Sequence, residues 1–226
     1  MTSISKHLQA ILATIESVKI EGQHLQSVRL LAVSKAQSAL TIREAYMAGQ
    51  TMFGESYLQE ALDKQAELAD LKIEWHFIGP IQSNKTQLIA QNFTWVHSID
   101  RLKIAQRLND ARPENFARLQ VCIQVNISGE ASKSGVTPSE LQALAACMTK
   151  LPNLKLRGLM AIPAPSNDEN KQAAQFKQVR ECYDALLANG FALDTLSIGM
   201  SDDYKIAITQ GATIVRIGSA LFGARK

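Results

Sequence analysis

The fold is decided by a strand–helix–strand pattern near the start of the chain, in residues 29–55, which read RLLAVSKAQSALTIREAYMAGQTMFGE. The opening run RLLAV is short and apolar and leads into polar residues, which is typical of a buried strand in a parallel sheet. The helix predicted over residues 38–48 stops at Gly49, because glycine is the residue most often found just after a helix. A second strand is predicted over residues 51–55. Parallel strands need a crossover helix between them, so this unit predicts a parallel α/β sheet.

The same pattern recurs to the end of the chain. Further strands are predicted at residues 74–79, 94–98, 119–127, 154–162, 195–198 and 213–217. Helices are predicted after the second strand to residue 71, at residues 83–91 and 100–112, from residue 137 onward, and at residues 168–188 and 202–209. The motif Thr137-Pro138-Ser139-Glu140 is a capping box with proline at the first helical position. An amphipathic helix over residues 3–18 is predicted to precede the first strand.

Eight strand–helix units within 226 residues predict a single (β/α)8 TIM barrel, with one domain over residues 1–226 and an extra N-terminal helix. The alternative is an open, doubly wound α/β sheet. The count of eight and the absence of a GxGxxG motif after the first strand favour the barrel.

Composition excludes several classes of protein. A hydrophobic content of 46% with 20% charged residues argues against a disordered chain. The balance of 24 basic and 21 acidic residues argues against nucleic acid as a partner, and no apolar run is long enough to span a bilayer. The start of the chain lacks the form of a signal peptide, and the three cysteines are widely spaced, so we expect a cytoplasmic protein. The histidines show no metal-ligand spacing, and no apolar stripe suggests a partner, so we expect no metal and a monomer.

Chemistry in a TIM barrel lies at the carboxyl ends of the strands, and Lys35 closes the first strand. Strand parity places Lys35 on the same face as Leu31 and Val33. If that face points inward, the amine is partly desolvated, which favours the neutral form that makes Schiff bases. On spacing alone, a solvated lysine at a strand end is the simpler interpretation.

The last two loops favour the Schiff-base interpretation of Lys35 over a solvated lysine. Residues 199–203 and 216–223 follow the seventh and eighth strands and offer small residues, hydroxyls and backbone N–H groups to an anion. Asp202 and Asp203 would repel a phosphate, and we expect both to face away as helix N-cap and first-turn residues. A lysine beside a phosphate cradle indicates a phosphorylated aldehyde, for which pyridoxal 5′-phosphate (PLP) is the obvious candidate.

Several short motifs are shared with one known family: LAVSK (31–35), FGE (53–55), WHFIGPIQSNK (75–85), VNISGE (125–130), KSG (133–135), GLM (158–160), GMSDD (199–203) and VRIG (215–218). In these motifs the chain resembles the pyridoxal phosphate homeostasis proteins, also called the proline synthase co-transcribed family, from about residue 30 onward. The resemblance implies a fold-type III PLP barrel related to the N-terminal domain of alanine racemase. It also implies that the protein acts in intracellular PLP homeostasis and makes transient contact with apo PLP-dependent enzymes.

The resemblance further implies roles for individual residues. Lys35 would form the internal aldimine with PLP. Ser201, Gly218 and Ser219 would surround the phosphate. Arg216 would lie near the pyridine nitrogen, where a permanently charged donor disfavours a protonated ring and weakens it as an electron sink.

Four further residues complete the predicted cofactor site: Met200, Asn126, Ser56 and His76. Asn126 is expected at the barrel mouth. Ser56 stands where the family usually has asparagine, so its contact with the cofactor differs from the family pattern. His76 shares its strand face with Ile78 and could approach the cofactor, although a hydrogen-bonded core histidine is the favoured interpretation.

Three functions follow from these residues. The first is a carrier and buffer that holds PLP with little or no catalytic turnover. The second is a PLP-dependent amino-acid racemase, which needs an acid or base on each face of the substrate carbon. Lys35 could serve one face, but the chain stops nine residues after Ile217, without a second domain to supply the other, and none of its four tyrosines is an obvious second base. The third is a Schiff-base aldolase without a cofactor, which would carry no bound chromophore.

Overall fold

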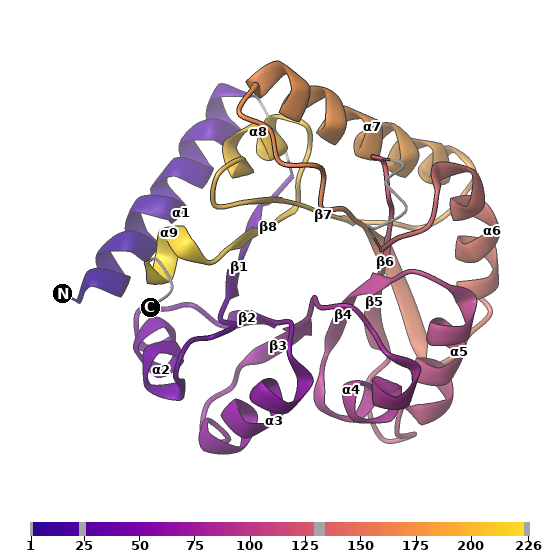
Figure 1. Ribbon diagram of the computed structural model, residues 1–226, viewed down its shortest axis with the longest axis horizontal. Helices are drawn as coiled ribbons and strands as arrows, with labels where there is room; N and C mark the ends of the chain where they lie inside the picture. The colour runs from indigo at the N-terminus through magenta and orange to yellow at the C-terminus, as the bar shows by residue number, and fades with distance from the viewer. Residues whose placement is uncertain (1, 23–25, 129–133, 224–226) are drawn as a thin grey trace.

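The computed structural model describes residues 2–22, 26–128 and 134–223. Within them the chain forms a closed barrel of eight parallel strands with helices around its outside (Figure 1). The strands pair in chain order, and the eighth closes on the first. The predicted TIM barrel is therefore confirmed, and the open sheet is excluded. Gly129, Glu130 and Lys133, from two of the quoted motifs, lie outside the described residues.

The elements agree with the predicted ones to within a few residues, except that the short last helix, residues 219–222, was not predicted. The strands are β1 (Arg29–Val33), β2 (Met52–Glu55), β3 (Glu74–Phe77), β4 (Trp95–Ile99), β5 (Leu119–Gln124), β6 (Leu154–Met160), β7 (Thr195–Met200) and β8 (Ile214–Ile217). The helices are α1 (Ser3–Glu21), α2 (Ala39–Met47), α3 (Leu58–Glu67), the 3-10 turn η1 (Ser83–Lys85), α4 (Thr86–Asn92), α5 (Leu102–Ala111), α6 (Pro138–Met148), α7 (Glu169–Ala188), α8 (Tyr204–Thr209) and α9 (Ser219–Phe222). None of the described helices is long and apolar enough to span a bilayer.

Local sequence signals explain where these helices begin. The side chain of Ser38 accepts a hydrogen bond from the backbone N–H of Thr41 and so caps α2. The predicted capping box starts α6, where the backbone N–H of Thr137 donates to Glu140 Oε2 at 3.0 Å.

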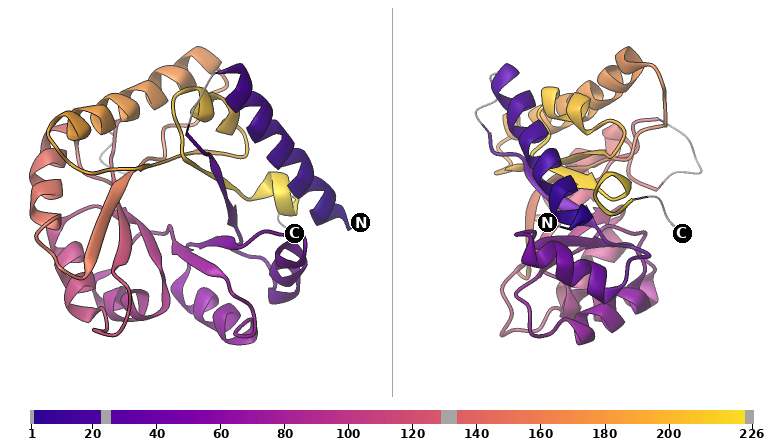
Figure 2. Two further views of the ribbon diagram at one scale, coloured as in Figure 1. Left: turned by 180° about the vertical axis from the view of Figure 1, so that it is seen from behind. Right: turned by 90° about the vertical axis from the view of Figure 1, so that its left-hand side faces the viewer.

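The extra helix α1 covers the flank of the barrel formed by the end of the chain. It lies beside α8 and α9, as both views in Figure 2 show. One face of α1 is buried there, through Ile4, Leu8, Ile11 and Ile15. The first and last helices of the described chain are therefore packed together.

Most of the apolar core lies between the barrel and its helices, while the barrel interior is mixed. Two small apolar clusters fill part of the interior: Leu31, Met52 and Ile214 with Ile78, and Trp95, Cys122 and Met160. Polar residues are completely or almost completely buried in the same space, among them His76, His97, Ser197 and Arg216. A buried polar group is costly unless it is hydrogen-bonded, so the partners of these residues matter for the site.

Candidate functional site

A cavity of about 230 Å³ opens at the carboxyl ends of the strands, where the fold predicts chemistry. Its walls are formed by Val33, Lys35, Gln37, Ser56, Ile78, Ile162, Met200, Ser201, Asp202, Arg216, Gly218, Ser219 and Gly223. Seven of the nine predicted site residues lie in this wall: Lys35, Ser56, Met200, Ser201, Arg216, Gly218 and Ser219. Lys35 and Val33 line the cavity together, as strand parity predicts.

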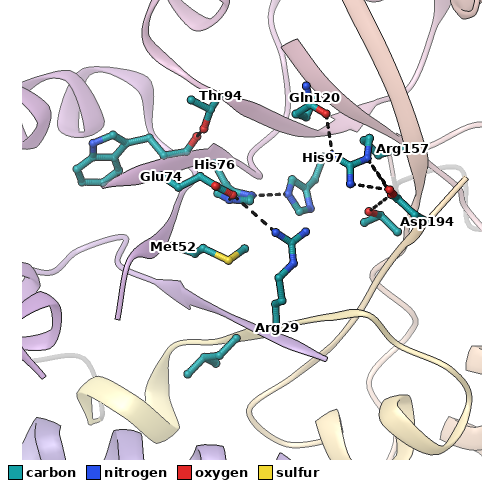
Figure 3. Close-up of polar contacts among 12 residues, drawn as sticks. Arg29, Met52, Glu74, His76, Thr94, His97, Gln120, Arg157 and Asp194 are labelled. Atoms are coloured by element: carbon teal, nitrogen blue, oxygen red, sulfur yellow. Dashed lines mark hydrogen bonds and ion pairs between the residues drawn. The ribbon is translucent and has the colours of Figure 1, made fainter. Parts of the chain in front are cut away.

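The other two predicted residues do not line this cavity. Asn126 lines an adjoining cavity of about 220 Å³, which shares Ile78 and Ile162 with the first. His76 is completely buried inside the barrel and is hydrogen-bonded to Glu74 and His97 (Figure 3). The structure thus shows His76 as a bonded core histidine and gives no support to its contact with a cofactor, because its ring nitrogens are used inside the barrel.

The backbone is held firmly on both sides of Lys35. The N–H of Ser34 donates to the Gly54 carbonyl at 3.0 Å, and its hydroxyl donates to Glu55 Oε1 at 2.6 Å. On the other side, the N–H of Ala36 donates to Glu60 Oε1 at 2.6 Å. Ala36 has a positive φ of 61°, which non-glycine residues seldom adopt. The lysine is therefore presented from a fixed, tightly turned segment.

A buried charge cluster lies behind this segment. The Lys64 amine donates to the Ser34 carbonyl and to Glu55 Oε1, each at 2.8 Å, and to Glu60 Oε1 at 2.5 Å. Glu55 is completely buried, and burial raises the pKa of its carboxyl, while the hydrogen bonds from Lys64 and Ser34 oppose that rise. Its second oxygen, Oε2, has no hydrogen-bond partner among the described residues. Sequence reasoning missed this cluster. The i, i+4 spacing of Glu60 and Lys64 indicates an ion pair, but one expected on a helix surface.

The loops after β7 and β8 meet at the other side of the cavity. The Ser201 hydroxyl oxygen accepts hydrogen bonds from the backbone N–H groups of Gly218 and Ala220, each at 3.3 Å. These long bonds leave both donors available to a stronger acceptor, such as an anion. Together with the Ser201 hydroxyl, they form a small cradle of donors.

The position of Ser201 depends on Gly199, the residue before Met200 at the end of β7. Gly199 has a φ of 90°, and a Cβ at this position would lie 2.5 Å from the Cβ of Ala207 in α8. Only glycine lets the strand end approach the helix this closely.

The two aspartates of this loop behave differently. Asp203 turns back and accepts the Met200 N–H at 2.6 Å, and its burial raises the pKa of its carboxyl. Asp202 is exposed but lies in the cavity wall, so the expectation that both aspartates face away is wrong for Asp202. The reason is that Asp203 occupies the N-cap of α8, which leaves Asp202 ahead of the helix at the rim.

Arg216 forms a charged part of the cavity wall and is almost fully buried. Its Nη1 donates to the Ser197 carbonyl at 2.5 Å and to the Ser197 hydroxyl at 3.0 Å, and its Nη2 donates to the Ala161 carbonyl at 2.8 Å. Burial lowers the pKa of Arg216 to about 10, so the group stays cationic at neutral pH. One Nη2 hydrogen and the Nε hydrogen have no hydrogen bond within the described part of the chain. They can serve an acceptor in the cavity.

The chain is similar in sequence to proteins that are named for pyridoxal phosphate homeostasis. It matches the family model described as alanine racemase, N-terminal domain, over residues 7–226. It is 58% identical over 226 residues to the pyridoxal phosphate homeostasis protein of Pseudomonas aeruginosa, covering 100% of this chain and 97% of that protein. It is 51% identical over 207 residues to the protein of the same name from Escherichia coli K12, covering 90% and 88% of the two chains.

Solved structures with a similar fold include a protein with PLP bound and an alanine racemase. PipY of Synechococcus elongatus PCC7942 with PLP bound matches with a TM-score of 0.87 and 37% identity, over 98% of this chain and 100% of that one. Alanine racemase from Corynebacterium glutamicum matches with a TM-score of 0.71 and 18% identity, over 94% of this chain and 61% of that one. The second likeness concerns the fold alone.

Proposed function

The chain belongs to the pyridoxal phosphate homeostasis proteins, and from this membership we propose that it holds PLP reversibly and acts as a carrier and buffer of the cofactor. One observation carries the proposal. A single cavity brings the segment that presents Lys35 together with the donor cradle of Ser201 and Gly218. Such a cavity suits a ligand with an aldehyde at one end and a phosphate at the other.

The residues in the wall fit each part of PLP. The Lys35 amine forms a Schiff base with the aldehyde carbon, and the aldehyde oxygen leaves as water. The phosphate would lie against the Ser201 hydroxyl and the backbone N–H groups of Gly218 and Ala220, with Ser219 between them. Three apolar side chains offer contact to the ring faces: Val33 at the end of β1, Ile78 just after β3 and Ile162 just after β6.

Arg216 is suited to the ring nitrogen. Its two uncommitted N–H groups can donate only to an acceptor, and an unprotonated pyridine nitrogen is one. A guanidinium in this place keeps the ring neutral, which limits its capacity to stabilise a carbanion. Ser56 and Met200 complete the wall around the ring, and Asn126 reaches the mouth from the adjoining cavity.

We propose that the protein has little or no catalytic turnover, in contrast to a racemase. Within the described residues, the titratable groups of the cavity wall are Lys35, Asp202 and Arg216. Tyr57 and Tyr204 lie outside that wall. A racemase needs a second proton donor opposite the lysine, and none of these groups is a good candidate. Racemisation of common amino acids at an ordinary enzymatic rate of roughly 1–10³ s⁻¹ would favour the racemase instead.

A carrier must also pass its cofactor on, so we propose transient contact with apo PLP-dependent enzymes by a monomeric protein. Light scattering of the purified protein tests the monomer. Mixing the loaded protein with an apo-aminotransferase tests the transfer, because regained transaminase activity then reports delivery. Activity that returns no faster than PLP dissociates into buffer would argue against direct contact.

An absorbance experiment tests the proposed function. The protein loaded with PLP is expected to absorb near ~420 nm, as Schiff bases of this cofactor do, and borohydride should fix the cofactor on the peptide that contains Lys35. Lys35→Ala should lose the band, whereas Lys150→Ala, which removes an exposed lysine after α6, should keep it. A Lys35→Ala variant with an unchanged, reducible band would overturn the assignment of the lysine.

A further inference from the structure

A chain of hydrogen bonds runs through the barrel interior from the cavity to the opposite end of the strands. Arg216 Nη1 lies 3.0 Å from Ser197 Oγ, which lies 2.9 Å from His97 Nδ1. His97 Nε2 lies 2.8 Å from His76 Nδ1, and His76 Nε2 lies 2.8 Å from Glu74 Oε1. The links come from β8, β7, β4 and β3, and Figure 3 shows the histidine end of the chain.

The hydrogen bonds of this series all donate in the same direction. The hydrogen bond from His76 lowers the pKa of Glu74, so the carboxylate can only accept, and His76 Nε2 carries its proton. Burial lowers the pKa of both histidines, which are therefore neutral, and each has one donor and one acceptor nitrogen. His97 Nε2–H thus donates to His76 Nδ1, and the Ser197 hydroxyl donates to His97 Nδ1. Every hydrogen points from the cavity toward Glu74.

This direction leaves a lone pair of Ser197 Oγ for Arg216. A serine hydroxyl that donates to His97 presents its remaining lone pairs to the guanidinium. The chain does not carry protons to the cavity, because arginine at its end has a donor but no acceptor and keeps its charge. Its effect is on geometry, since it fixes where Arg216 can donate.

The far end of the chain is itself anchored. The ring of Trp95 stacks on His76 with centroids 5.3 Å apart and an angle of 9° between the planes. The guanidinium groups of Arg157 and Arg29 lie 4.7 and 5.4 Å from the Trp95 ring centre, and Arg29 Nη1 lies 3.9 Å from Glu74 Oε1. Figure 3 shows Glu74, Arg29 and Arg157 near the two histidines. The imidazoles are held by both packing and hydrogen bonds.

We propose that Ser197, His97, His76 and Glu74 are positioning residues that hold the Arg216 guanidinium in one orientation, with its two uncommitted N–H groups toward the cavity. The consequence for PLP rests on the proposed function. Glu74, which lies at the amino ends of the strands, would then affect the cofactor without touching it. Apolar side chains alone could fill this space, as Leu31, Met52 and Ile214 fill the neighbouring part, but they could not orient an arginine.

The first test uses the protein without PLP. Nitrogen NMR at pH 7 should show both His76 and His97 as neutral Nε2–H tautomers, and the two Nη atoms of Arg216 should give separate, slowly exchanging signals. Ser197→Ala removes one oxygen from the hydrogen-bond chain but leaves the bonds from Arg216 to the Ser197 and Ala161 carbonyls, so the two Nη signals should stay separate and exchange faster than in wild type. Ser98→Ala is the matched control, because it removes a buried hydroxyl that donates to the Gly79 carbonyl and lies outside the chain. Either imidazole protonated at Nδ1, or signals of Ser197→Ala that match those of Ser98→Ala, would overturn the proposal.

The second test follows PLP in two variants of the remote end. Glu74→Leu removes the acceptor for His76, whereas Glu74→Gln keeps an oxygen there. Glu74→Leu should release PLP about tenfold faster, as the loss of one charged hydrogen bond predicts, and Glu74→Gln should stay within about twofold of wild type. Equal effects of the two variants would argue against positioning. If the wild-type protein holds no PLP at all, the proposed function fails, while the NMR result still decides the orientation of Arg216.

Discussion

Lys64 and Glu55 form an ion pair that is buried on both sides, with exposed side-chain fractions of 7% and 0% and a distance of 2.8 Å between Nζ and Oε1. Taking two charges out of water costs much of what their attraction returns, so such a pair is weak evidence of stability. Here the pair holds Ser34 by its carbonyl and its hydroxyl, directly before Lys35. Its position indicates that it shapes the segment that presents the lysine.

Lys64→Met should therefore be strongly destabilising, because it leaves the Glu55 carboxylate buried without a cation. We expect the free energy of unfolding to fall by about 3–5 kcal/mol in urea denaturation. Arg43→Met is the control, since it breaks an exposed pair with Asp70 and should change little. Equal losses in the two variants would show that burial of the Lys64 pair has no special weight.

The loss in Lys64→Met should also depend on pH. Burial already raises the pKa of Glu55 above its value in an unfolded chain, and removal of the cation raises that pKa further. A carboxyl group whose pKa is higher in the folded protein lowers the free energy of unfolding as the pH rises above its pKa in the unfolded chain. The difference between wild type and variant should thus be larger at pH 8 than at pH 5. A difference that does not vary with pH would contradict the assignment.

The two buried histidines predict that the wild-type protein loses stability in mild acid. Their pKa values are lowered by burial in the folded state, with Glu74 opposing the effect at His76 and with Arg29 and Arg216 adding to it at His97. Below about pH 6.5 these histidines bind protons in the unfolded chain but stay neutral in the folded protein, so the free energy of unfolding falls. His97 alone should cost about 1.4 kcal/mol per pH unit in that range. Urea denaturation between pH 7.5 and 5.5 measures this slope, and His97→Gln should flatten it. An equally steep slope in His97→Gln would rule out this source.

Ser201→Ala should weaken binding of the phosphate rather than of the ring. We expect an affinity for PLP about tenfold lower, since one hydrogen bond to a charged group is lost, and an unchanged affinity for pyridoxal, which has no phosphate. Titration by absorbance measures both, with Ser139→Ala on α6 as a control distant from the cavity. Equal weakening of PLP and pyridoxal would place Ser201 elsewhere in the site.

Gly199→Ala should disturb the same loop through packing. The added methyl group would meet Ala207 at 2.5 Å, and the positive φ of 90° is unfavourable for alanine. We expect a loss of about 2–4 kcal/mol in the free energy of unfolding. Gly49→Ala is a close control, because Gly49 also has a positive φ, 106°, but has open space around its Cβ position. If both variants lose the same free energy, backbone strain alone is responsible and the contact with α8 is not.

The sequence pattern predicts the barrel and most of its cavity, because both depend on local signals. Strand parity places Lys35 on one face with Leu31 and Val33, and the small residues of the last two loops indicate the cradle for an anion. The hydrogen-bond chain could not be predicted in this way, since His97 and Ser197 are one hundred positions apart and meet only across the barrel. The burial of the Lys64 amine could not be predicted either. The helix pattern shows which face of the helix is polar, but it does not show that this lysine is buried against Ser34 and Glu55. Asp202 was misplaced because the sequence does not show which of two adjacent aspartates begins the helix.

Closure of the barrel has a consequence for how the protein is made. Strand β1 pairs with β8, and Leu31 lies opposite Arg216, so the first and last strands share the pocket. A nascent chain leaving the ribosome therefore exposes its lysine long before the cradle for the phosphate has been synthesised. Cofactor capture waits for the final strand, and translation that stops short of it yields a product that cannot load at all.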